Sequence, residues 1–325
     1  YMVENSLGRL WVEGHPNDEL KANWKYYLEE APQEPEVEEQ LKKIQAEYAQ
    51  IDPASILCCD PCMGSGHILV YMFDVLMQIY LSYGYTTNEA VESIVRNLWG
   101  MDIDDRAAQL AYFAVMMKAQ QYDHRWLAKQ VRHPVQPHVF ALQDSGNWSA
   151  FEGQMHRAFS NHPSLFEDAS IKTAKALFDT FADAKEYGSI IQPDITLEDL
   201  DMLEKVLDEM QQQADLMDFV AQADAMTLMK TLKPLILQCR ALALKYHVVV
   251  TNPPYRGISD VGPVLQEFVQ KHYPDSSSDL STVFMEQCLN MTSALGYLSM
   301  INIPVWMTLG CYSELRAIPH NSLAA

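Results

Sequence analysis

The chain has 325 residues, of which 48% are hydrophobic, and its formal net charge is −20 at pH 7. A chain of this length buries a large core and is long for one simple sheet domain. It holds no 18-residue apolar window and does not open with a signal peptide, which argues against a membrane protein.

The N-terminal part, residues 1–50, is expected to be helical with breaks near Pro32 and Pro35. The acidic run Glu34–Glu39 is interpreted as a solvated linker. A short apolar strand follows over Ile56–Cys59 and ends at Asp60.

A glycine loop connects this strand to an almost wholly apolar helix over residues 68–81. Strand, glycine loop and helix together indicate the start of a Rossmann-like unit. The glycines, Gly64 and Gly66, let the backbone approach a ligand, and the helix N-terminus favours an anion. A carboxylate at Asp60 is suited to hold an ammonium group.

Two further strands are expected to end in acidic residues. Leu98–Asp104 predicts a strand and the start of a helix, which Asp104 caps. Asp102 stands where this fold usually has the acceptor for ribose hydroxyls. His138–Ser145 predicts the third strand, and Asp144 near its end, taken alone, is more often a turn residue than a ligand. In chain order with the other strand-end motifs it becomes a candidate acceptor for an adenine amino group.

Residues 151–240 show no alternating strand pattern, and their leucines recur at helical spacing, which predicts a helical insertion. An extra helix is also expected near Asn88–Asn97. The methionines of the insertion are interpreted as helix-packing core: Met202, Met210, Met217, Met226 and Met229.

The apolar run Tyr246–Thr251 predicts a fourth, buried strand. Two prolines, Pro253 and Pro254, end it where open α/β sheets bind ligands. Beside them Asn252 offers an amide oxygen and Tyr255 a flat stacking face. This set suits a planar base with an exocyclic amino group, and the alternative interpretation is a strand-end turn with a buried tyrosine.

The cysteines at 58, 59, 62, 239, 288 and 311 are scattered. Cys59 and Cys62 form half of a metal site, and no second CxxC completes it. We therefore predict no metal site and interpret all six as reduced core cysteines of a cytoplasmic protein.

In chain order, these motifs resemble those of the adenine-N6 DNA methyltransferases, which use S-adenosylmethionine (SAM). Within that family the chain is most similar to the PglX-type methyltransferases of BREX phage-defence systems. The stretches that carry the resemblance are DPCMGSGH (60–67), GMDID (100–104), LQDS (142–145), NPPY (252–255), the stretch 273–286 and the strand 296–301 before Pro304.

The resemblance implies a Rossmann-like SAM-dependent methyltransferase sheet with helices on both faces. Four parts are expected: an N-terminal helical segment (1–50), a SAM-binding half (51–150), the helical insertion (151–240) and a catalytic-loop half (241–325). The implied catalytic residues are Asn252, Pro253, Pro254 and Tyr255, and the implied cofactor contacts are Asp60, Pro61, Gly64, Ser65, Gly66, Asp102, Ile103 and Asp144.

The implied roles follow by position. Asp60 would hold the amino group of SAM, Asp102 its ribose hydroxyls and Asp144 its adenine amino group. The target adenine would be flipped out of double-stranded DNA and stacked on Tyr255, with its amino group on Asn252. Other proteins of a defence system are the further partners that the resemblance implies.

The net charge is unfavourable for DNA binding, which relies on Lys and Arg contacts to phosphates. Residues 1–60 carry 13 acidic and 5 basic residues, and 151–240 carry 16 and 8. We therefore expect a fragment that lacks a DNA-recognition domain and some N-terminal SAM-lining residues. By itself it should bind DNA poorly and be inactive.

Alternative functions remain open at this point. The same loop serves methyltransferases that act on RNA bases or on a protein glutamine, whereas cytosine-N4 enzymes more often have Ser at the place of Asn252. A non-catalytic specificity or assembly module with this fold is an alternative of another class. An NAD dehydrogenase is disfavoured because nothing in such an enzyme explains the NPPY loop.

Overall fold

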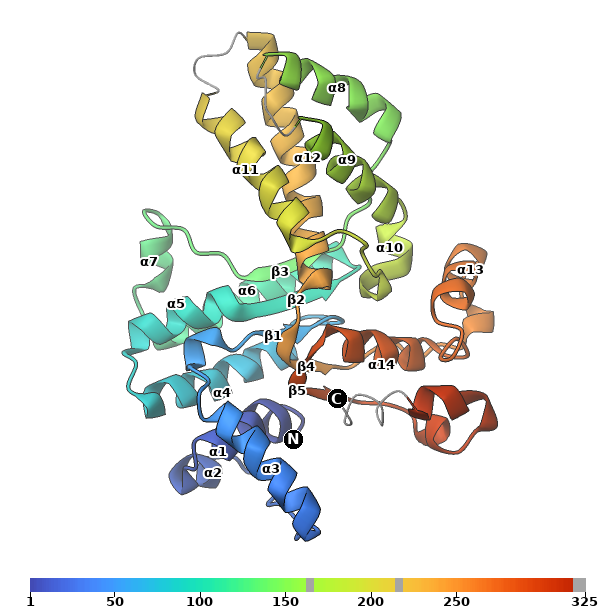
Figure 1. Ribbon diagram of the computed structural model, residues 1–325. Helices are drawn as coiled ribbons and strands as arrows, with labels where there is room; N and C mark the ends of the chain where they lie inside the picture. The colour runs from blue at the N-terminus through green and yellow to red at the C-terminus, as the bar shows by residue number, and fades with distance from the viewer. Residues whose placement is uncertain (162–166, 214–218, 318–325) are drawn as a thin grey trace. The chain divides into compact units, whose positions relative to one another are not determined.

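A computed structural model describes residues 1–161, 167–213 and 219–317 (Figure 1). The chain divides into two compact units. The sheet unit consists of Tyr1–Ala141 and Lys245–Ala325, and the helical unit of Leu142–Leu244. Among the described residues, none of the helices combines the length and the apolarity that a bilayer crossing requires.

The sheet unit is built on five parallel strands in the order β3-β2-β1-β4-β5. This architecture confirms the predicted Rossmann-like α/β class. The strand order reverses at the β1–β4 neighbours, and ligands of open α/β sheets bind at the carboxyl ends beside such a point. The strands are β1 (Cys58–Asp60), β2 (Leu98–Asp102), β3 (His138–Ala141), β4 (Tyr246–Thr251) and β5 (Thr292–Met300).

The helices of the sheet unit begin at caps that the sequence provides. Thr86 and Glu89 form a capping box at the start of α5, and Asp104 accepts the Arg106 N–H at the start of α6, as predicted. The helices are α1 (Arg9–Gly14), α2 (Asp18–Asn23), α3 (Pro35–Tyr48), α4 (His67–Tyr83), α5 (Thr87–Asn97), α6 (Asp105–Tyr122), α7 (Trp126–Gln130), α13 (Pro263–His272) and α14 (Leu280–Met291).

The core of the sheet unit forms around α4, whose apolar sequence is explained by its burial. Met72, Phe73 and Leu76 of α4 are buried in one cluster with side chains of β1, β2 and β4. N-terminal residues such as Leu10 and Trp11 belong to the same cluster. The N-terminal helices are therefore part of this core. Burying each of their large apolar side chains stabilises the fold by about 1.5–3 kcal/mol.

The acidic run Glu34–Glu39 is not a linker, which corrects the prediction. Glu34 precedes the first residue of α3, and Pro35 occupies its first position. Proline is tolerated there because the first helical N–H needs no intrahelical partner, and acids near a helix N-terminus are favourable. The run is solvated as expected, since every residue in it is exposed.

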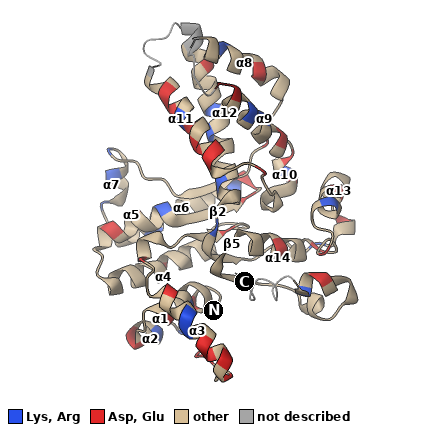
Figure 2. Ribbon diagram, viewed as in Figure 1, with Lys and Arg blue, Asp and Glu red and all other residues tan. Residues whose placement is uncertain are grey.

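The helical unit consists of helices in the described part, as the leucine spacing predicted. Leu200, Leu203 and Leu207 of α11 are buried, as are Leu228 and Leu232 of α12. The ribbon in Figure 2 marks acidic residues along α11 and, in the sheet unit, on α3. The helices are α8 (Trp148–Asn161), α9 (Glu167–Thr180), α10 (Ala184–Tyr187), α11 (Leu197–Gln213) and α12 (Phe219–Ala243).

The interpretation of the methionines as helix-packing core is confirmed for Met210 and wrong for Met226. Met210 is buried, but Met226 is 61% exposed because it points away from the buried face of α12 that Leu228 marks. Met202 and Met229 are only partly buried, and Met217 lies outside the described residues.

The third strand is shorter than predicted, because β3 ends at Ala141. The next backbone N–H groups bond outside the sheet. Gln143 donates to Gln238 Oε1 over 2.6 Å, and Ser145 donates to the Phe181 carbonyl over 2.8 Å. These bonds lie within the helical unit. They take the place of the hydrogen bonds to β2 that a longer β3 would need.

Of the six cysteines, four are buried as predicted, at 58, 59, 239 and 288. Cys62 is partly buried and Cys311 is exposed, which corrects the interpretation of all six as core residues. Cys62 follows the β1 strand end, where the loop leaves the core.

Candidate active site

The last residue of β1, Asp60, is fully buried at the carboxyl end of the sheet. Its Oδ1 accepts from the Thr251 hydroxyl over 2.7 Å and from the Cys62 N–H over 3.1 Å. Its Oδ2 is buried and has no hydrogen-bond partner among the described residues. No sequence motif pointed to Thr251. Its hydroxyl-bearing side chain directly before Asn252 was the one local feature that could have indicated a role.

The charge state of Asp60 is set by its surroundings. Burial raises its pKa to about 7, against the lowering effect of the bonds from Thr251 and Cys62. The nearby carboxylate of Asp102 raises the pKa further. A cation at Oδ2 would stabilise the ionised form, so this oxygen suits an ammonium group.

The glycine loop after β1 lies against the end of β2. The Gly64 N–H donates to Asp102 Oδ2 over 2.9 Å, and Asp102 Oδ1 accepts from the Asp104 N–H over 3.0 Å. These bonds fix the Asp102 carboxylate, and each oxygen keeps a lone pair for a further donor. The sequence-predicted Asp60, Gly64 and Asp102 are therefore brought together.

Gly66 allows α4 to start close to α6. Its φ is +84°, and a Cβ at this position would lie 2.9 Å from the Ala111 Cα. Both the backbone conformation and the space therefore require glycine. The N-terminus of α4 is held at the loop by this packing.

The other predicted cofactor contacts differ in exposure. Pro61 is buried, Ser65 Oγ lies 3.0 Å from His67 Nδ1, and the Ile103 side chain is 50% exposed next to Asp102. Asp144 belongs to the helical unit, where its Oδ1 accepts from the Lys185 N–H over 2.9 Å. Its predicted role stays a prediction.

The Asn252–Tyr255 loop follows β4 directly. Asn252 is exposed, Pro253 is buried and Tyr255 is 44% exposed. The Tyr255 hydroxyl lies 2.7 Å from Asn252 Oδ1 and 2.9 Å from the Ile301 carbonyl. The single hydroxyl hydrogen can bond to either acceptor, and burial raises the Tyr255 pKa, so the phenol stays protonated.

His247 lies within β4, as predicted. Its Nδ1 accepts from the Leu57 N–H over 3.1 Å, and burial lowers its pKa. The ring is therefore neutral, and it serves as a hydrogen-bond acceptor for the backbone just before β1.

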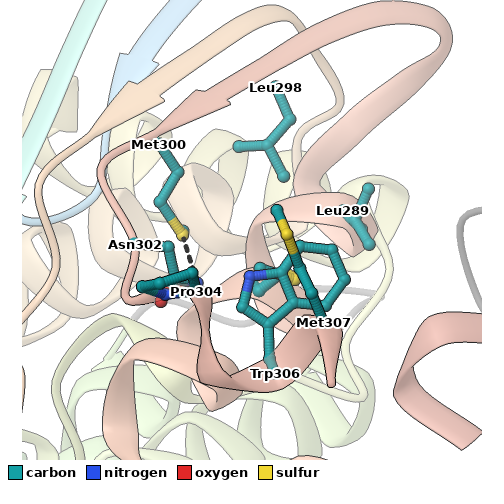
Figure 3. A pocket seen from close by; sticks show the side chains of 8 residues that line it. Leu289, Leu298, Met300, Asn302, Pro304, Trp306 and Met307 are labelled. Atoms are coloured by element: carbon teal, nitrogen blue, oxygen red, sulfur yellow. Dashed lines mark hydrogen bonds between the residues drawn. The ribbon is translucent and has the colours of Figure 1, made fainter. Parts of the chain in front are cut away.

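A pocket of about 350 Å³ opens beyond the carboxyl end of β5 (Figure 3). Asn302 is its main polar side chain, with Nδ2 donating to Met300 Sδ over 3.7 Å. No sequence motif indicated this pocket, although Met300, Trp306 and Met307 lie close together at and after the end of β5. It is lined by Met285, Leu289, Leu298, Met300, Asn302, Pro304, Trp306 and Met307.

Comparison with known proteins gives consistent matches. Residues 96–323 match the Eco57I restriction-modification methylase family. The chain is 36% identical over 331 residues to "Adenine-specific methyltransferase BrxX" of Escherichia coli O9:H4 (strain HS), covering 97% of this chain and 26% of that protein. It is also 36% identical over 327 residues to "Adenine-specific methyltransferase PglX" of Lacticaseibacillus casei (strain Zhang), covering 97% and 25%.

These two relatives confirm the predicted resemblance to PglX-type methyltransferases. The chain spans about a quarter of the length of the curated relatives it matches. The family match covers more than half of the chain and includes β2 through β5. The chain therefore belongs to the Eco57I restriction-modification methylase family.

Proposed function

We propose that the protein transfers a methyl group from SAM to the N6 amino group of adenine in DNA. The observation that carries this proposal is the pairing of two ligand-binding features at the switch point of the sheet. Asp60, whose Oδ2 has no hydrogen-bond partner in the described part of the chain, ends β1, and the Asn252–Tyr255 loop follows the neighbouring β4. The Thr251 hydroxyl links the two over 2.7 Å.

The residues around β1 and β2 fit SAM. Asp60 Oδ2 would accept from its ammonium group, and the N-terminus of α4 favours its carboxylate. Asp102 would accept from the ribose hydroxyls, and exposed Ile103 would cover the adenine ring. When bound, SAM supplies a methyl group on a positively charged sulfur.

The chain's own contribution to the reaction is positioning. Asn252 Oδ1 and the Pro253 carbonyl would accept from the target amino group, and the Tyr255 ring would stack on the flipped base. Two acceptors draw the nitrogen lone pair out of conjugation with the ring and direct it for in-line attack. Orientation and electrostatics supply the rate enhancement, without a covalent nucleophile.

Double-stranded DNA is the proposed substrate. The proposed location of the protein is the cytoplasm. The net charge of −20 opposes contact with phosphates. We therefore assign the main phosphate contacts to parts of the complete protein outside residues 1–325. Other proteins of a defence system are proposed as partners on the resemblance to the PglX-type methyltransferases of BREX phage-defence systems.

The decisive experiment is methylome sequencing of the host with and without the complete gene. Loss of N6-methyladenine at one defined DNA sequence on deletion is the expected result. An unchanged DNA methylome, with methyl groups lost from RNA or from a protein glutamine instead, would contradict the DNA substrate.

Asp102→Ala is expected to weaken SAM binding by roughly 1–3 kcal/mol, since ribose hydroxyl donors would be left unpaired. The substitution also removes the acceptor for the Gly64 N–H, which loosens the glycine loop. Calorimetric titration of SAM into the complete wild-type and variant proteins measures the effect. Equal affinities would contradict the ribose assignment.

A further inference from the structure

Thr251 joins the two parts of the candidate site. We propose that Thr251 is a positioning residue that holds the Asp60 carboxylate and the Asn252–Tyr255 loop in one arrangement. The inference rests on the proposed function and adds a residue that none of the sequence motifs assigns. Thr251 and Asp60 are both fully buried, and their side chains meet over 2.7 Å.

A series of hydrogen bonds leads from Thr251 back to the loop. The Thr251 carbonyl accepts from the Ile301 N–H over 3.3 Å, and the Ile301 carbonyl lies 2.9 Å from the Tyr255 hydroxyl. The same hydroxyl lies 2.7 Å from Asn252 Oδ1. Because Asn252 is covalently bonded to Thr251, both acceptors of the Tyr255 hydroxyl lead back to Thr251 across β4 and β5, and its single hydrogen bonds to one of them at a time.

The Thr251 hydroxyl also determines which oxygen of Asp60 remains available. It donates to Oδ1, together with the Cys62 N–H, and Oδ2 is left for an ammonium group. Valine at 251 would have the same branched shape without the donor. The Asp60 carboxylate would then keep only the Cys62 N–H and lose part of its fixed orientation.

The titratable groups that interact with Asp60 in the described part of the chain are acids. They lie on three sides: Asp102 on β2, Cys59 and Cys62 on β1 and its loop, and Cys288 on α14. Burial raises the pKa of each of these thiols, so they remain neutral. Hydrogen-bond donors such as Thr251 therefore support the Asp60 charge, and their loss should be visible as a change in pH dependence.

The experiment compares Thr251→Val with Thr251→Ser in the complete protein. Thr251→Val should weaken SAM binding about 10- to 100-fold at neutral pH, the usual effect of losing a hydrogen bond to a charged group. The midpoint of the pH dependence of SAM binding should move upward by about one pH unit. Thr251→Ser keeps the hydroxyl and should restore both quantities. Calorimetric titrations of SAM across the Asp60 pKa measure them.

Thr282→Val is the matched control. Thr282 is another fully buried threonine, and its hydroxyl lies 2.7 Å from the carbonyls of Ser276 and Asp279. Its recorded bonds among the described residues do not involve Asp60. This variant should keep the wild-type SAM affinity and midpoint. A Thr251→Val protein with wild-type affinity and midpoint would overturn the proposal.

A second readout separates this proposal from the proposed function. If the wild type bound no SAM at any pH, the proposed function would fail. The pH dependence of unfolding without cofactor would still test Thr251. The pH at the midpoint of this stability profile should rise in Thr251→Val and stay unchanged in Thr282→Val. Equal midpoints in both variants would contradict the role of Thr251.

Discussion

Asn252→Ala is expected to reduce methyl transfer to adenine by about 10²–10³-fold, the usual effect of removing one preorganised contact to a reacting group. SAM affinity should stay near wild type, because Asn252 Oδ1 meets Tyr255 and makes no bond to Asp60. Single-turnover methylation with labelled SAM and calorimetry on the complete protein measure the two quantities separately.

Asn97→Ala provides a matched control for Asn252→Ala. Asn97 donates to the Ala54 carbonyl over 2.6 Å and directly precedes β2, at the amino ends of the strands. It should leave the single-turnover rate unchanged. A full rate in Asn252→Ala would show that this loop does not hold the target amino group.

Asp60→Asn is expected to remove most of the SAM affinity. The proposed ammonium–carboxylate pair is buried, and removing one partner of a buried pair costs about 3–5 kcal/mol. Wild-type affinity should also rise as the pH passes the Asp60 pKa of about 7, because only the ionised carboxylate attracts the ammonium group. Calorimetry across this range should show the rise in the wild type and a weak, flatter profile in the variant.

The raised pKa of Asp60 also affects the stability of the cofactor-free protein. Folded Asp60 keeps its proton up to about pH 7, whereas the unfolded chain releases it near the ordinary value of 3.8. The native state therefore binds more protons between these values. This stabilising contribution is fully present below the unfolded pKa and is lost as the pH rises through the folded pKa.

Relative to Asp60→Asn, the wild type should lose roughly 2–4 kcal/mol of unfolding free energy between about pH 4 and about pH 8. Urea unfolding at a series of pH values measures the difference. Asp52→Asn, at the opposite end of β1, removes an exposed carboxylate and should keep the wild-type profile. Parallel profiles for wild type and Asp60→Asn would contradict the raised pKa.

Much of the fold was predictable because local signals coincide with tertiary structure in this chain. The run Tyr246–Thr251 is apolar without alternation, as a strand covered on both faces requires, and it forms β4. Asp104 could be predicted as a cap because its side chain bonds two residues away. The positions of Asp60 and Asn252 at strand ends followed from where apolar runs stop.

The contacts between these positions were not predictable from local signals. The bond between Thr251 and Asp60 joins residues 191 positions apart, and it depends on the register of β1 beside β4. Similarly, the contact of Tyr255 with Ile301 requires the β4–β5 register. The exposure of Met226 shows the same limit, because helical spacing places a side chain on a face but does not say which face is covered.

The resting contact between Tyr255 and Asn252 has a thermodynamic consequence for the proposed reaction. An incoming amino group would displace the Tyr255 hydroxyl from Asn252 Oδ1, and the hydroxyl would then donate to the Ile301 carbonyl, its other acceptor. This exchange adds little to ground-state affinity, because Asn252 already has a donor. The amino nitrogen gains positive charge as the new bond forms and becomes a stronger donor than a phenol. Recognition of the target nitrogen by Asn252 would therefore appear in kcat rather than in KM.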